Sequence, residues 1–124
     1  MQIDDLIGKP FRLGAAGPAE YDCWHLCREV SHRAGIELPA VPSVTDPIER
    51  DSAIKSTSGR FLKLDRPEPF CLVTLRMRGR LVTHIGVVLK DCQRFIHAVR
   101  DMSVCIENLE DWRERIDGYY EYIG

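Results

Sequence analysis

The sequence predicts an α+β fold, with a helical N-terminal part packed on an antiparallel sheet of four or five strands. Two observations predict it. Apolar residues recur at helical spacing after Asp22 in the first half, whereas apolar and polar residues alternate along several short segments of the second half. The chain has 124 residues, a length that suits one hydrophobic core, so residues 1–124 are expected to form a single domain.

The most strongly patterned element is the helix predicted to begin after Asp22. Its apolar face consists of Cys23, Leu26, Cys27, Val30 and Ala34. Asp22 is a typical N-cap residue, and Gly35 can adopt the left-handed conformation that follows many helices. Before this helix, residues 3–7 predict a short helix, and the glycine- and proline-rich stretch 8–18 predicts a loop.

The second half of the chain predicts the sheet. Strands are expected over 70–77, 81–89, 94–99 and 102–107, and the aromatic tail 119–123 is expected to add a fifth. Asn108 is expected to cap a short helix that runs through Arg115. The polar stretch 47–58 fits either an exposed helix or an irregular connection.

Charge and hydropathy exclude several classes of protein. Seventeen basic and nineteen acidic side chains give a net charge of −2, which argues against a strongly basic surface for nucleic acid. Asp4 and Asp5 stand where a secretory signal would carry basic residues, so no signal peptide is expected. The longest nearly apolar run, 81–89, is far shorter than the ~20 residues of a membrane span. Five cysteines, an odd number, are expected to remain reduced.

Cys23 is a candidate nucleophile because it occupies the first turn of the predicted helix. Unpaired backbone N–H groups and the helix dipole favour negative charge there. We therefore expect its pKa to fall below the usual value of about 8.5 when an imidazole lies nearby. On position alone, a small buried core residue is an equally good interpretation.

His84 and His97 are the candidate partners of Cys23. If residues 90–93 form a four-residue turn between antiparallel strands, Gly86 faces His97, and both imidazoles lie on one face of the sheet as diagonal neighbours. Gly86 has no side chain, so we expect space there for the two rings and a substrate. With Cys23, the histidines would supply a nucleophile, a base and a group that orients the base, as amide cleavage by a cysteine enzyme requires.

These segments resemble a known family. Residues 22–26 (Asp-Cys-Trp-His-Leu) are similar to the Asp-Cys-Trp-Gly-Leu or Asp-Cys-Ser-Gly-Leu segment of NlpC-type cell-wall cysteine peptidases. Residues 83–87 and 94–98 resemble the two histidine motifs of that family, in the same order. The likeness runs from about Gly8 to the tail, since residues 8–11 with Gly14 resemble the family's opening loop and 112–120 resemble the ending of phage tail members.

The resemblance implies a compact papain-like (NlpC-type) fold without a metal or organic cofactor. It implies Cys23 as nucleophile, His84 as general base and acid, and His97 as the residue that orients His84. The implied substrates are peptidoglycan stem peptides, cut at links such as that between D-glutamate and diaminopimelate. Phage or prophage tail proteins are the implied partners. Such a chain is made in the bacterial cytoplasm and acts at the cell wall as a tail component.

The sequence departs from the family pattern at three places. Phe11 stands where many members have a tyrosine, so a hydroxyl donor near the nucleophile is absent. His25 replaces the glycine two residues after the nucleophile, and residues 69–71 replace a common Gly-Asp pair. The backbone N–H of Cys23 is then the expected oxyanion donor, and loss of one other donor typically costs about 3 kcal/mol.

Two alternatives to a peptidase remain open at this point. The first is a non-catalytic phage tail assembly or wall-binding module on the same scaffold, which Phe11 and His25 motivate. The second is a zinc-binding domain whose ligands would be Cys23, Cys27, His84 and His97. The zinc interpretation is weaker because twelve residues separate the histidines, more than in the usual structural zinc motifs.

Overall fold

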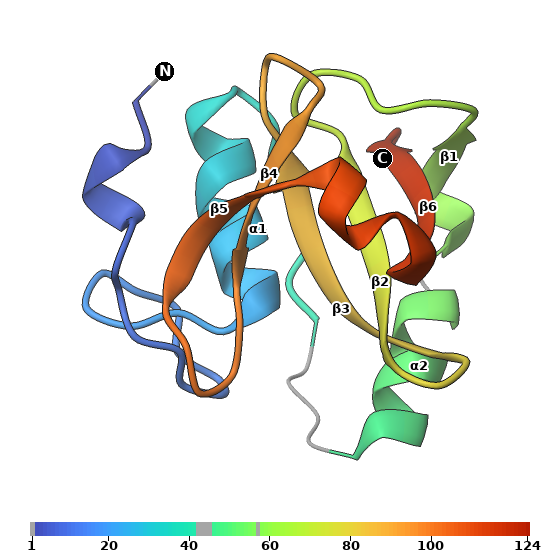
Figure 1. The fold of residues 1–124 in the computed structure, drawn as a ribbon, viewed down its shortest axis with the longest axis horizontal. Coiled ribbons are helices and arrows are strands. Elements are labelled where there is room, and N and C mark those ends of the chain that lie inside the picture. The colour runs from blue at the N-terminus through green and yellow to red at the C-terminus, as the bar shows by residue number, and fades with distance from the viewer. Residues whose placement is uncertain (1, 42–45, 57) are drawn as a thin grey trace.

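The structure, a computed structural model, describes residues 2–41, 46–56 and 58–124. Two α-helices are present in this part of the chain, α1 (Cys23–Arg33) and α2 (Pro47–Ser56) (Figure 1). Three short 3₁₀ helices are η1 (Asp4–Leu6), η2 (Ser58–Arg60) and η3 (Leu109–Arg115). None of the described helices has the length and apolar character needed to cross a membrane.

The strands form one antiparallel sheet, with the order β1-β6-β2-β3-β4-β5 over the described residues. Their bounds are β1 Phe61–Leu64, β2 Leu72–Arg78, β3 Leu81–Val88, β4 Arg94–Ala98, β5 Val104–Asn108 and β6 Ile116–Tyr122. The predicted α+β class is therefore confirmed, and the sheet gains a sixth strand, β1. Four residues are too few to show a pattern by themselves, and β1 exists because it pairs with β6 from Phe61 opposite Tyr122 to Leu64 opposite Tyr119.

Other elements match the expectations with small differences. Within the uncertain stretch 47–58, helix α2 covers Pro47–Ser56, and residue 57 lies outside the described residues. The short helix before β6 is a 3₁₀ helix, and the Asn108 side chain makes no capping hydrogen bond to it. All five cysteines are free, as expected.

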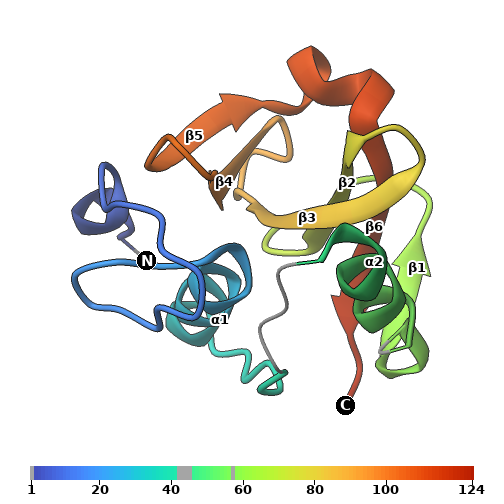
Figure 2. The same ribbon diagram turned by 90° about the horizontal axis from the view of Figure 1, so that it is seen from below.

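Two hydrophobic cores lie on opposite faces of the sheet. On one face, α1 packs its buried residues Leu26, Cys27 and Val30 against the central strands. On the other face, η3 contributes Leu109 and Trp112 to a second core with Phe95. Figure 2 shows this layering, with both α-helices on one side of β3 and η3 on the other. The sheet therefore carries side chains in a packed environment on both faces.

The hairpin between β3 and β4 has the predicted register. Val87 pairs with Ile96 and Val88 with Phe95, and the Leu89 N–H donates to the Arg94 carbonyl. Asp91 closes the turn by accepting hydrogen bonds from the N–H groups of the two residues at its end. This register places His84, Gly86 and His97 on one face of the sheet.

Gly86 does not leave an open space for a substrate, because β4 already fills it. A Cβ atom at Gly86 would lie 2.9 Å from the Ile96 carbonyl oxygen, 2.9 Å from the Phe95 ring and 3.2 Å from the His97 Cβ. The glycine therefore permits close approach of two strands rather than access of a ligand.

We predict that Gly86→Ala lowers the free energy of unfolding by about 1–3 kcal/mol, because the added methyl group overpacks the strand interface. Urea unfolding followed by circular dichroism measures it. Gly59→Ala is the matched control, since a Cβ there meets no atom within 4 Å and the backbone is not left-handed. Equal stability of both variants and the wild type would contradict the close approach.

Asp22 joins the opening loop to the start of α1. One of its carboxylate oxygens accepts hydrogen bonds from the backbone N–H of His25 and from His25 Nδ1, both at 2.8 Å. The other accepts from the N–H of Gly14 at 3.0 Å. The side chain is buried, so the N-cap predicted from the sequence is present and also holds the loop.

We predict that Asp22→Ala costs about 1–2 kcal/mol of stability, the upper range for a lost N-cap, because both segments lose their acceptor. The same urea titration measures the change. Asp65→Ala, at an exposed turn carboxylate, should stay within about 0.5 kcal/mol of the wild type. A difference between the two variants below that margin would show that the Asp22 bonds add nothing.

Candidate active site

Three side chains form a hydrogen-bonded row across β3, β4 and β5. His84 Nε2 lies 2.8 Å from His97 Nδ1, and His97 Nε2 lies 2.5 Å from Glu107 Oε2. The two imidazoles are therefore diagonal neighbours, as the hairpin register predicts. Glu107 is the third member of the row, and the sequence analysis did not identify it. Cys105 pairs with His97, and Glu107 lies two residues further along β5, on the same face of the sheet.

His97 is held rigidly by its surroundings. Its side chain is 0% exposed and packs against two aromatic rings. The Phe95 ring centre lies 4.5 Å from that of His97, and the Trp112 ring meets His97 edge-on at 5.2 Å. Both ring nitrogens have hydrogen-bonding partners, so the imidazole has one orientation that satisfies its polar atoms.

Both histidines are neutral at pH 7. Burial lowers the pKa of His84 to about 3, and the nearby His97 and Arg50 add to this effect. Burial also lowers the pKa of His97, against the opposing effect of its hydrogen bond to Glu107. A neutral imidazole has one nitrogen with a proton and one with a free lone pair, so each ring can both donate and accept.

Cys23 is the first residue of α1 and lines a pocket of about 290 Å³. The residue as a whole is partly exposed. The pocket is mainly apolar, and its wall includes Thr83 and Ile85, the residues on either side of His84 along β3. In the described part of the chain, no hydrogen bond joins the Cys23 sulfur to His84.

The pKa of Cys23 differs from the expectation for a thiol at a helix N-terminus. Burial raises it to about 11, and the neighbouring Asp22 carboxylate adds to the increase. Arg50 and the backbone N–H groups of Trp24 and Cys23 act in the opposite direction. The expectation of a lowered pKa was wrong because desolvation of the sulfur outweighs the charge-stabilising groups around it.

Arg50 of α2 is a site residue that the sequence did not indicate. Its guanidinium donates to the Thr83 carbonyl at 3.4 Å and lines the pocket with Cys23. Its charge lowers the pKa of both Cys23 and His84, so it lies within electrostatic reach of each. The next residue, Asp51, accepts a hydrogen bond from the Val82 N–H at 2.8 Å, which docks α2 against β3. Nothing in the polar pattern of 47–58 marked either contact.

The structure explains one departure from the family pattern and locates another. His25 makes its ring hydrogen bond to Asp22, so it reinforces the start of α1. Phe11 lines the Cys23 pocket, where a tyrosine would have brought a hydroxyl group. The Trp24 ring lines the same pocket, and its Nε1 donates to the Pro39 carbonyl at 3.0 Å.

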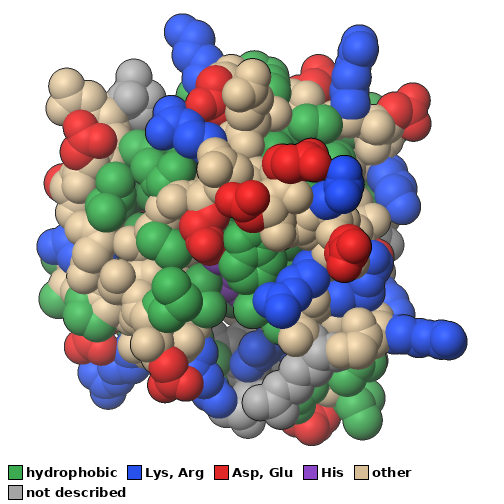
Figure 3. Space-filling view, in the orientation of Figure 1, with side chains coloured by type: hydrophobic (Ala, Val, Ile, Leu, Met, Phe, Trp, Pro, Cys, Tyr) green, Lys and Arg blue, Asp and Glu red, His purple; other side chains and the backbone are tan. Residues whose placement is uncertain are grey.

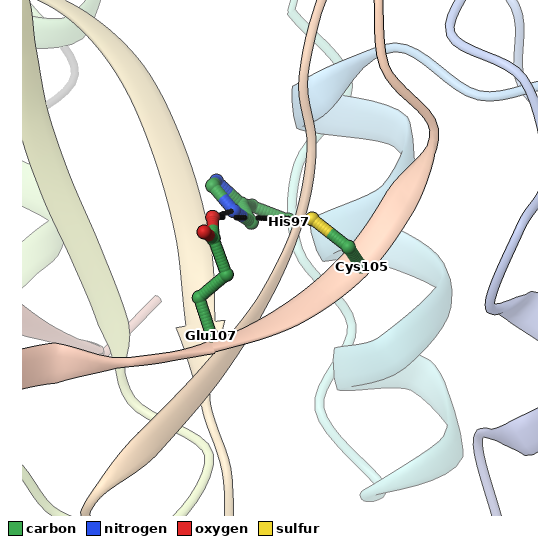
Figure 4. Close-up of side chains that lie close together, drawn as sticks. All are labelled: His97, Cys105 and Glu107. Carbon is green, nitrogen blue, oxygen red and sulfur yellow. Dashed lines mark hydrogen bonds and ion pairs between the residues drawn. The ribbon is translucent and has the colours of Figure 1, made fainter. Parts of the chain in front are cut away.

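The four residues of the zinc interpretation do not come together. Cys27 is fully buried in the core under α1, whereas His97 lies in the core on the other face of the sheet. Among the described residues, ligand atoms gather instead at His97, Cys105 and Glu107, all within 4.8 Å of one another. Figure 4 shows these three side chains converging from β4 and β5. In this group, the His97 nitrogen already binds the Glu107 carboxylate.

Charges of both signs are mixed on the molecular face above this row (Figure 3). Acidic side chains gather near its centre, and a small area of histidine surface is visible beside them. The mixture on this face agrees with the net charge of −2.

Solved structures with this fold come from bacteria and a protozoan. NlpC1 and NlpC2 of Trichomonas vaginalis superimpose with TM-scores of 0.69 and 0.70, at 20% and 16% identity. A Staphylococcus aureus protein described as similar to lipoprotein, of the NLP/P60 family, gives a TM-score of 0.63 at 22% identity. The matches cover 93%, 94% and 94% of this chain, but only 39%, 43% and 37% of those proteins.

Comparison of the sequence with protein families identifies the family of this chain. Curated proteins include no match to the sequence. The NlpC/P60 family profile matches residues 8–119, which is most of the chain. Members of that family are generally hydrolases that act on peptidoglycan, and the match includes Cys23, His84 and His97. The chain therefore belongs to the NlpC/P60 family.

Proposed function

We propose that this protein is a cysteine peptidase that hydrolyses peptide bonds in peptidoglycan stem peptides. The observation that carries the proposal is the Cys23 thiol at the wall of a mainly apolar pocket, beside the β3 segment that contains His84. The hydrogen bond between His84 Nε2 and His97 leaves His84 Nδ1 as the nitrogen available for proton transfer. Membership of the NlpC/P60 family supports the substrate class.

In the proposed reaction, Cys23 Sγ attacks the carbonyl carbon of the scissile amide, and its proton passes to His84. The C–N bond breaks as His84 returns that proton to the leaving amine, which leaves a thioester on Cys23. Water then attacks the thioester, with His84 as general base, and releases a carboxylic acid and the free thiol. The backbone N–H of Cys23 is the proposed donor to the oxyanion.

The resting thiol and imidazole are both neutral, so the proton moves during attack rather than before it. Substrate binding in the pocket removes water from the sulfur and brings the carbonyl carbon close to it. His84 then acts as a general base toward a neutral thiol. His97 is the positioning residue that holds the base.

The pocket chemistry suits an acidic peptide. Its apolar walls can accept the aliphatic parts of a stem peptide, and the positive charge of Arg50 beside Cys23 favours a carboxylate near the cleaved bond. A link between D-glutamate and diaminopimelate carries such carboxylates. We propose bonds of this type as the site of cleavage.

The proposed setting is a phage or prophage tail, where the enzyme would open the wall locally or serve in tail assembly. The likeness of residues 112–120 to the ending of phage tail members supports this setting. Mass spectrometry of purified tail particles from an induced host tests it. Detection of the chain in the particles would support a tail role, and its absence from them would oppose it.

A non-catalytic tail or wall-binding module is the second candidate. Two observations favour it, namely the raised pKa of Cys23 and the phenyl ring of Phe11 in place of a hydroxyl donor. A binding module would sediment together with peptidoglycan but would not cleave it.

We predict that the wild-type protein releases peptide fragments from purified peptidoglycan, identified by mass spectrometry. Cys23→Ala and His84→Ala should lower the release rate by roughly 10³-fold or more, because each removes a group on which the others depend. Cys92→Ala is the control, since this cysteine lies in the β3–β4 turn and should leave the rate unchanged. Binding without release by the wild type would favour the non-catalytic module.

We predict that Cys23 reacts slowly with iodoacetamide at pH 7 and that its rate keeps rising above pH 9. The reason is that only the thiolate reacts and the pKa of Cys23 is raised to about 11. Mass spectrometry of the labelled peptide measures the rate, and Cys23→Ser assigns the signal. Rapid labelling that is already maximal at pH 6 would mean that the free protein holds a thiolate.

A further inference from the structure

Glu107 occupies the outer end of the hydrogen-bonded row and has no part in the reaction steps above. Its side chain is 32% exposed, so one carboxylate oxygen reaches inward to the buried His97 while the residue remains in contact with solvent. The same oxygen lies 3.9 Å from Cys105 Sγ. The aromatic rings of Phe95 and Trp112 also pack against the His97 ring.

If Glu107 is a carboxylate, the protons in the two hydrogen bonds of the row can be placed in only one way. A carboxylate only accepts, so the proton between Glu107 and His97 must lie on His97 Nε2. His97 is neutral, and its Nδ1 then has the free lone pair. That lone pair faces His84 Nε2 at 2.8 Å, so the proton of His84 lies on Nε2. His84 Nδ1 is left without a proton.

Without Glu107, the opposite placement of the protons would form the hydrogen bond between His97 and His84 equally well. His97 Nδ1 would carry the proton and donate to His84 Nε2, and His84 would carry its own proton on Nδ1. In that form, the nitrogen that the proposed mechanism uses as a base cannot accept a proton. The choice between the two placements depends on an acceptor at the outer end of the row.

We propose that Glu107 is a positioning residue that sets the tautomers of His97 and His84 and so keeps His84 Nδ1 ready to accept a proton. The catalytic consequence rests on the proposed peptidase function, whereas the tautomers themselves do not. Glu107 acts through His97 and need not touch the substrate. The effect resembles that of the buried carboxylate in serine proteases, moved one imidazole further from the base.

NMR of imidazole nitrogens tests the proposal directly, because the ¹⁵N signals of protonated and unprotonated ring nitrogens are well separated. The full-length ¹⁵N-labelled protein is measured at pH 7, and His25→Gln and His32→Gln identify the two histidines outside the row. The wild type should show His84 and His97 both protonated at Nε2. A proton on Nδ1 of either ring in the wild type would overturn the proposal without any Glu107 variant.

Three variants then test the role of Glu107. Glu107→Leu removes the acceptor at similar size, and both histidines should shift partly or wholly to the Nδ1-protonated form. Glu107→Gln keeps an oxygen acceptor but adds an NH₂ donor that fits the opposite placement of the protons, so it should retain more of the wild-type tautomers than Glu107→Leu does. Glu110→Gln, which changes an exposed carboxylate of η3 that pairs with Arg113, is the matched control and should have no effect. Wild-type tautomers in a folded Glu107→Leu protein would overturn the proposal.

Kinetics on peptidoglycan fragments supplies the functional arm. Glu107→Leu should lower kcat by about 10- to 100-fold, the size typical of lost outer hydrogen bonds, with KM little changed. Glu107→Gln should recover part of that loss. If the wild type releases no fragments, the peptidase proposal fails while the NMR result still decides the role of Glu107. Should Glu107→Leu fail to fold, Glu107→Ala takes its place in the same NMR measurement, with the same expected shift and the same overturning result.

Discussion

The burial of His97 with a partner on each ring nitrogen is the constraint on which the rest of this site depends. A buried polar ring is tolerated when its hydrogen bonds are satisfied, and here they come from neighbouring strands on both sides. The register of β3, β4 and β5 must therefore be held to the residue, because a slip by one position would turn one partner to the opposite face. The aromatic rings of Phe95 and Trp112 close the space around the ring.

The pocket that Cys23 lines is held together by contacts from the start of α1 and from α2. Asp22 holds the opening loop to α1, and α2 is held to β3 through Asp51. These contacts bring Cys23 and Arg50 to one cavity although 26 residues lie between them in the sequence. The site thus combines a hydrogen-bonded row of histidines with a pocket whose walls come from both the helices and the sheet.

Features that depend on neighbouring residues in the chain could be predicted from the sequence. The cap at Asp22 and the face shared by His84 and His97 follow from local spacing, and both are present. Strand β1 could not be predicted because its four residues are stabilised by a strand at the far end of the sequence. The same holds for Arg50, which reaches β3 only through tertiary packing.

The ionisation of Cys23 is the clearest case in which local reasoning was insufficient. A helix N-terminus predicts a lowered pKa, but the cost of desolvation depends on which residues pack over the sulfur, and that is a property of the whole fold. Gly86 is similar, since its missing side chain indicated space and the structure places another strand there. Glu107 needed the register of a third strand before it could be linked to His97.

The docking of α2 has a consequence for the behaviour of the protein in concentrated solution. β4 pairs with β3 at Val87 and Val88, and further along β3 the main-chain groups of Val82 and Thr83 bind side chains of α2 instead. A helix that occupies such groups shields a strand margin that could otherwise recruit a strand from a second molecule. Detachment of α2 would expose these main-chain groups to a strand of a second molecule, so the contacts of Arg50 and Asp51 also oppose intermolecular sheet growth.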